Sequence, residues 1–362
     1  MSKRMKRIKW LWVAMVLFTA VSLACQLSSV DLLPIEPDKP PQPHLPEFAP
    51  PEKGFNRGNP FAVGEPIELE NWVVEVLQFA RGQEAWDQLK TLPYNNEAPA
   101  VGEEYVLVQM HITHTNESAE EESVGIALTG SAGLKHHSFN SSVTPPAPYL
   151  VSTMAGGESQ EGWYAFVIVE GETDLMLVVE DHSLLDEPLM YGALEEGASL
   201  LVPTDLTAVQ PTNRGQDIRE PVPFGSTVTN EDWELTVTDV VVGEEAWEML
   251  LDANQFNDPP GRGVEYVLAK IKIRYLGQGD QPTNMYSYYL RLLNHDRDAY
   301  DTPALVEPIP RFDFVMYPGA EAEGWLALAA RQGDTGLMLR FNPTYQDDSP
   351  EIRYLSLDAG GR

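Results

Sequence analysis

A short polar segment, Asn294-His295-Asp296-Arg297-Asp298, carries oxygen-bearing side chains at alternate positions. Asn294, Asp296 and Asp298 match the first half of a calcium-binding loop, whose ligands are carboxylate and amide oxygens at every second residue. The second half would need glycine and glutamate where this chain has Ala299 and Leu305. A polar hairpin turn explains the segment more simply. We expect no cofactor, with calcium at this turn as the alternative.

Two histidine groups also have spacings at which side chains can share a metal. His111 and His114 are three residues apart, but on a strand such residues face opposite sides of the sheet. Lys135-His136-His137 falls in a predicted turn, without a carboxylate or cysteine close by in the sequence. We therefore expect no metal site at either group.

Two sets of side chains are candidates for contact with a partner. Lys270, Lys272 and Arg274 form a basic stripe along one face of a predicted strand. Trp86 and Trp247 stand at matching places near the start of two predicted helices, so each is either a core residue or an exposed contact.

Composition and motifs exclude several classes of function. The sequence contains no Gly-x-Ser-x-Gly elbow, no phosphate-binding loop and no His-Glu-x-x-His, so we expect no enzyme. The net charge is −31, and five of the 24 Lys and Arg residues lie within the first nine positions. Nucleic acid is an unsuitable partner, because binding to phosphates needs clustered cations.

The first 25 residues read as an export signal. Five cations precede an apolar run of about a dozen residues, and small residues lead to Cys25, the single cysteine of the chain. The stretch resembles a bacterial lipoprotein signal, although Ser22 and Leu23 depart from the usual order of apolar and small residues. The resemblance implies a signal peptide at 1–24 and an acyl chain such as palmitate on Cys25. An ordinary signal cut near Ala24 and an uncleaved anchor are the alternatives, and all three place the remainder outside the cytoplasm.

The rest of the chain is a tandem duplication behind a proline-rich segment. Eight prolines between residues 34 and 51 predict that 25–59 is a disordered tether. Segments 70–114 and 231–275 share 16 identities over 45 positions. We expect one domain at 60–203, a linker at 204–220, a second domain at 221–357 and a tail at 358–362.

Each repeat reads as mostly strand. Val267, Ala269, Ile271 and Ile273 alternate with polar or exposed residues, which predicts a strand with one buried face, and the first repeat has the same pattern. Further strands are predicted at 72–79, 163–169, 174–180, 233–242, 287–293, 324–330 and 336–341. Helical spacing predicts one short helix per repeat, at Glu84–Leu92 and Glu244–Phe256.

This pattern predicts an all-β chain of two tandem immunoglobulin-like sandwiches, each with an inserted helix. The Val63-Gly64-Glu65-Pro66-Ile67 opening, Gly-x-Glu-Tyr-Val-Leu and the late Glu-Gly-Trp resemble an immunoglobulin-like domain family of unknown function, loosely labelled telomeric-repeat-binding-factor-like. The resemblance covers both repeats and implies a secreted bacterial lipoprotein, without implying an activity.

We therefore expect a lipid-anchored, extracytoplasmic binding module on the cell membrane that contacts a protein or another envelope component. One alternative is a lipoprotein that binds a small ligand or a divalent cation. The other is a structural spacer at the surface.

Overall fold

The computed structural model describes residues 52–358, except 118–119, 139–142, 183–187, 202 and 204. The predicted signal peptide, Cys25 and most of the predicted tether and tail lie outside the described residues. Among the residues described, no helix is both long enough and apolar enough to cross a membrane. Pro51–Arg362 group into one compact unit.

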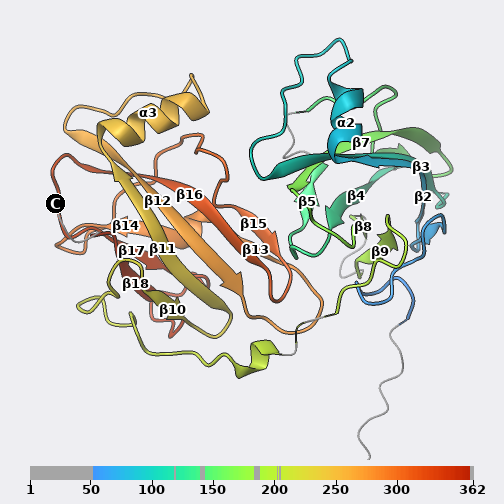
Figure 1. Ribbon diagram of the computed structural model, residues 1–362. Helices are drawn as coiled ribbons and strands as arrows, with labels where there is room; N and C mark the ends of the chain where they lie inside the picture. The colour runs from blue at the N-terminus through green and yellow to red at the C-terminus, as the bar shows by residue number, and fades with distance from the viewer. Residues whose placement is uncertain are drawn as a thin grey trace, which may run out of the picture. The chain divides into compact units, whose positions relative to one another are not determined.

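The first repeat forms two antiparallel sheets around a common core (Figure 1). One sheet has the order β1-β2-β3-β7, with bounds Ile67–Glu68, Trp72–Arg81, Glu103–His114 and Ser159–Val169. The other has the order β5-β4-β8-β9, with bounds His136–His137, Glu121–Thr129, Met176–Asp181 and Met190–Ala193, and β6 (Thr153–Ala155) also pairs with β4.

The second repeat has the corresponding two layers and its own core. Its larger sheet has the order β10-β11-β12-β16, with bounds Thr227–Thr229, Trp233–Val242, Val264–Tyr275 and Glu321–Arg331. The smaller sheet is β14-β17-β18, with bounds Leu290–Leu293, Met338–Phe341 and Arg353–Ser356. A separate two-stranded sheet pairs β13 (Thr283–Met285) with β15 (Phe314–Met316). The short 3-10 helix η2 (Asp205–Ala208) precedes this repeat, and η3 (Ser287–Tyr289) lies within it.

Both repeats contain one α-helix between their two longest early strands. α2 spans Gly82–Leu89 and α3 spans Glu244–Ala253, so each ends three residues before its predicted end. Figure 1 shows α3 crossing one end of β11 and β12. The expectation of an all-β sandwich fold with one short helix per repeat is confirmed.

An asparagine side chain fixes the end of each helix. The amide nitrogen of Asn96 donates to the carbonyl oxygens of Leu89 and Thr144, and the backbone N–H of Thr144 donates back to Asn96 Oδ1. Asn257 makes the same three bonds with Leu250 and Val306. In each repeat this side chain therefore attaches the last turn of the helix to a distant loop.

The central strand β3 is buried on both faces, which the simple alternation does not predict. Val106, Val108, Met110 and Ile112 face the core, as expected. Leu107 faces the other way, yet it is fully buried, because it packs with Ala85 and Leu89 of α2 in a second cluster. We expected Gln109 to point into solvent, but it is only 8% exposed. The helix therefore covers what would otherwise be the solvent face.

Two segments predicted to be unstructured connections are folded where the structure describes them. Residues 52–59, assigned to the tether, include Arg57, which is 3% exposed and pairs with Asp280 at 2.7 Å. Within the predicted linker, Leu206 is buried, and the carbonyl of Thr212 accepts a bond from the buried guanidinium of Arg353. Part of the predicted tether and part of the predicted linker therefore pack against the repeats.

Candidate binding site

The outer face of the β14-β17-β18 sheet carries an open cavity of about 430 Å³. We call it the tyrosine basin, and its lining combines aromatic, charged and amide side chains: Tyr288, Tyr289, Tyr345, Arg291, Arg340, Asn342 and Asp347. Two of the tyrosines come from η3, the arginines come from β14 and β17, and the other residues follow β17. The basin therefore lies where a short helix, two strands and a loop meet.

Strand pairing places the two arginines side by side. Arg291 on β14 is the direct partner of Arg340 on β17. Their neighbours Leu292 and Leu339 are buried in the core. Because side chains alternate across a strand, both guanidinium groups project from the outer face.

The same face of the first repeat has a different composition. Counting from the repeated Leu-Met-Leu segments at 175–177 and 337–339, the pairing of β4 with β8 places Ala127 and Val178 at the positions of Arg291 and Arg340. Ala127 and Val178 are each 1% exposed and belong to an apolar cluster that includes Tyr317 of the second repeat. One outer face is therefore covered by its own chain, whereas the other carries an open cavity.

The cover on the first repeat is held by buried polar contacts. The hydroxyl groups of Tyr191 and Tyr317 lie 3.1 Å apart. The guanidinium of Arg57 lies 3.8 Å from the centre of the Tyr317 ring while it pairs with Asp280. Burial raises the pKa of both tyrosine hydroxyls, which therefore stay neutral.

Tyrosine rings in the basin form one connected group. Tyr288 stacks on Tyr286, with 4.7 Å between ring centres, and on Tyr345, with 5.6 Å between them. Tyr289 meets Tyr288 and Tyr345 edge to face, at 5.1 and 5.2 Å. Tyr288 is 50% exposed and Tyr345 is 63% exposed, so aromatic surface remains accessible.

The loop after β17 positions Tyr345. Asn342, which is 8% exposed, accepts a hydrogen bond from the backbone N–H of Thr344 and donates to the carbonyl of Gln346, forming a tight Asx turn. Within this turn Tyr345 has φ 58°, a left-handed conformation that costs a bulky residue about 1–3 kcal/mol. An ion pair of 2.9 Å between Arg340 and Asp347 attaches the loop to the sheet.

The lining can make directional polar contacts but contains no group poised for proton transfer. Desolvation raises the pKa of Tyr289 and of Tyr345, so both hydroxyls remain neutral donors and acceptors at physiological pH. The arginines can only donate and the Asp347 carboxylate can only accept. These groups can orient a bound molecule through directional hydrogen bonds.

The polar turn at Asn294–Asp298, where calcium was the alternative, is closed by its own hydrogen bonds. Asn294 Oδ1 accepts the backbone N–H of Asp298 at 2.9 Å, and Arg297 takes a left-handed conformation with φ 73°. Asn294 is 7% exposed, whereas Asp296 and Asp298 are exposed. No group of three or more His, Cys, Asp or Glu side chains in the described residues could hold a metal ion.

The basic stripe on β12 is paired along its length. Lys270 contacts Glu323 at 2.9 Å and Lys272 contacts Glu321 at 2.7 Å, both on the neighbouring strand β16. Arg274 lies 3.6 Å from Glu234 on β11. The stripe therefore presents little unbalanced positive charge to a partner.

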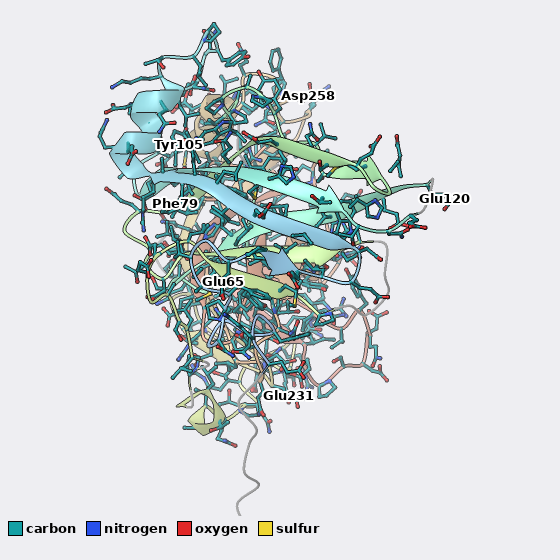
Figure 2. The ribbon with its side chains drawn as sticks, turned by 90° about the vertical axis from the view of Figure 1, so that its right-hand side faces the viewer. Glu65, Phe79, Tyr105, Glu120, Glu231 and Asp258 are labelled. Atoms are coloured by element: carbon teal, nitrogen blue, oxygen red, sulfur yellow. The ribbon has the colours of Figure 1, made fainter. Side chains whose placement is uncertain are left out.

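Trp86 and Trp247 have matching surroundings. Each lies 6.1 Å from the ring of a β-strand tyrosine, Tyr105 or Tyr266, at an interplanar angle of 41°. Figure 2 shows Tyr105 beside α2. Both tryptophans are partly buried against the helix-side clusters, so they attach the helices to the sheets.

The histidines are more involved in packing than the sequence indicated. His114 is fully buried, stacked on Trp72 with 4.2 Å between ring centres, and bonded to Glu122 at 3.0 Å. His136 and His137 form the short strand β5 rather than a turn. A carboxylate that is distant in the sequence lies close by in the structure, because Glu172 is 2.9 Å from His136.

The tyrosine basin was missed in the sequence. Its one local signal is the Tyr286-Ser287-Tyr288-Tyr289 run, which we read only as the start of a strand. Tyr345 and the arginines are brought to this run by strand pairing, which local periodicity does not show.

Comparison with known proteins finds only weak similarity, and that similarity is to solved structures. No protein-family model and no curated protein matches the chain. A solved structure of a candidate lipoprotein from Bacillus subtilis is 12% identical, with a TM-score of 0.30, over 38% of this chain and 39% of that one. This chain thus spans well under half of that protein's length.

Two further solved structures match a similar part of the chain. An uncharacterised β-sandwich protein from Clostridium difficile is 11% identical, with a TM-score of 0.23, over 38% of this chain and 95% of that one. A conserved hypothetical protein from Bacillus anthracis is 11% identical, with a TM-score of 0.22, over 37% and 95%. Values this low assign no function.

Proposed function

We propose that this chain is a non-catalytic binding module, exported and held at the membrane by a lipid on Cys25, with the tyrosine basin as its binding surface. The observation that carries the proposal is the open cavity lined by exposed tyrosine rings and by charged side chains of both signs. Concave sites with aromatic walls and a few directional polar groups are the usual form of ligand sites.

The proposed location is supported by the sequence. A cationic start, an apolar run and a single cysteine at position 25 form the pattern of a lipidated export signal. Membership of the immunoglobulin-like lipoprotein family is proposed on the repeated motifs. Replacing Cys25 with Ser should release the protein from the membrane fraction; retention of the variant there would contradict lipid anchoring.

The binding role is tested by affinity capture. The full chain, purified in detergent, is immobilised and exposed to envelope extract, once with calcium and once with chelator. We expect saturable capture that the Tyr288→Ala variant loses and that Tyr94→Ala, an exposed tyrosine elsewhere, retains. Capture that is equal in both variants would place the binding surface outside the basin. Capture of nothing by a folded protein would favour a spacer.

A test of calcium dependence distinguishes the second candidate function, divalent-ion binding, from the basin proposal. A divalent-ion role through Asn294, Asp296 and Asp298 predicts that added calcium raises the melting temperature and that chelator reverses the rise. No change with calcium would remove that candidate and leave the basin proposal intact.

A further inference from the structure

We propose that the tyrosine basin binds a glycan, with a sugar ring packed against the exposed parts of Tyr288 and Tyr345 and a sugar carboxylate held by Arg291. This inference rests on the proposed binding function and specifies its ligand class. Three features of the basin support it: the exposed tyrosine side chains, the mixture of donors and acceptors, and an arginine without a carboxylate partner among the described residues.

The aromatic rings supply flat apolar surface with polar edges. A pyranose ring has one or two faces made of C–H groups, which pack on an aromatic face, while its hydroxyl groups point outward around the rim. Tyr288 and Tyr345 are exposed by 50% and 63%, and their rings are inclined to each other by only 27°. Because Tyr345 and Tyr286 both stack on Tyr288, a saccharide would pack against the exposed parts of this stacked group rather than across two coplanar faces.

The polar lining matches hydroxyl groups better than peptide groups. Arg291 and Arg340 only donate hydrogen bonds, and Asp347 only accepts them. A sugar hydroxyl both donates and accepts, so it can satisfy either kind of group. A proline-rich peptide offers mainly carbonyl acceptors, because proline has no N–H, so it would pair with the arginines and make little use of the acceptor oxygens of the lining.

The charge balance of the basin points to an acidic sugar. Arg340 is paired with Asp347 at 2.9 Å. Arg291 is exposed, and within the described residues it has no carboxylate partner. A planar guanidinium binds a carboxylate through two parallel hydrogen bonds. Arg291 thus leaves the basin with one uncompensated positive charge in a chain whose net charge is −31.

Two features of the basin lower the stability of the fold, and a binding role would account for their presence. Arg291 and Arg340 lie directly opposite each other on paired strands, and like charges in this arrangement are destabilising. A non-glycine residue with φ 58° is also unfavourable, yet Tyr345 adopts it. The first repeat has Ala127 and Val178 at the arginine positions, so the sandwich itself does not require the charged pair.

The test uses the full chain in detergent and a printed array of neutral and carboxylate-bearing oligosaccharides, followed by titration with tetragalacturonate and cellotetraose. We expect Tyr288→Ala and Tyr345→Gly to weaken binding at least tenfold. Glycine suits the left-handed position, so the second variant removes the ring without backbone strain. Tyr94→Ala is the matched control and should bind as the parent does. Arg291→Gln should weaken tetragalacturonate about tenfold and change cellotetraose less than twofold.

The outcomes separate this inference from the proposed function. Glycan binding that fails in both tyrosine variants supports both. An envelope protein captured through the basin, with no array glycan bound, overturns the glycan and keeps the binding module. Glycan binding that the two variants leave unchanged overturns the basin as the site. A folded protein that binds neither glycan nor envelope material overturns both proposals.

Discussion

Arg291 and Arg340 are direct partners across β14 and β17, and among the described residues only Arg340 is paired with a carboxylate. Two cations in this arrangement repel each other, and the Asp347 partner relieves only one of them. On the open face of the second repeat, this charge pair lowers the stability of the fold while it supplies groups for the proposed binding.

Replacing Arg291 with Thr should therefore stabilise the protein. Removing the repulsion and adding a β-branched residue should raise the free energy of unfolding by about 0.5 kcal/mol, less in high salt because the charges are screened. Urea unfolding at low and high ionic strength measures this. Arg274→Thr is the control, since it removes contacts with Glu234 and Glu321 and should give no gain. A destabilised Arg291→Thr protein would show that the pair is favourable.

His114 should be a major contributor to the first core. Replacing it with Ala removes a ring stacked on Trp72 and leaves the Met154 carbonyl without its partner. We expect a loss of about 3 kcal/mol in unfolding free energy by urea titration. His111→Ala, on the same strand but only half-buried, should stay within about 0.5 kcal/mol of the parent. Equal effects at the two positions would contradict the buried role.

The asparagines that end the helices should not tolerate aspartate. Asn96→Asp and Asn257→Asp would each place a carboxylate against two carbonyl oxygens in place of two hydrogen bonds. Each should cost about 1–3 kcal/mol in chemical unfolding. The matched control is Asn254→Asp, because Asn254 uses only its oxygen, which accepts the backbone N–H of Phe256. A control as damaging as the other two would point to charge rather than to lost donors.

The pH dependence of stability should contain a contribution from His137. Burial, and then the nearby Lys135 ammonium, lower the pKa of His137 to about 4. The unfolded chain therefore takes up this proton first as the pH falls, and the stability present above about pH 6.5 is lost toward pH 4. Glu180 acts in the opposite direction, and His136 and His182 reinforce the shift.

We expect His137→Gln to lose less stability than the parent between pH 7 and pH 4.5, by about 2 kcal/mol, as measured by urea unfolding at each pH. Parallel pH profiles for the parent and His137→Gln would show that this histidine titrates normally.

Local sequence patterns predicted much of the fold. Alternation identified the long strands β3 and β12, and helical spacing identified α2 and α3, because these patterns depend on residues close in the chain. The internal repeat also pointed to residues with structural roles, since Trp86 and Trp247, and Asn96 and Asn257, make equivalent contacts.

The site could not be predicted in the same way. Alternation shows which side of a strand faces its own core, but it does not show what covers the other side. Leu107 packs beneath a helix and Val178 packs with Tyr317, whereas Arg291 is exposed. Partners distant in sequence were missed for the same reason. Lys135 pairs with Glu180 and His136 pairs with Glu172, 45 and 36 residues away.

The asymmetry between the two outer faces fixes the valency of the chain. Because Tyr317 and its neighbours cover the face of the first repeat that would correspond to the basin, duplication has not produced two equivalent binding sites. The described part of each chain then presents one basin of this kind, so avidity toward a repeating polymer would depend on how densely chains stand on the proposed membrane anchor. Tyr317 of the second repeat thus covers the outer face of the first repeat, and that face is not available as a second copy of the proposed site.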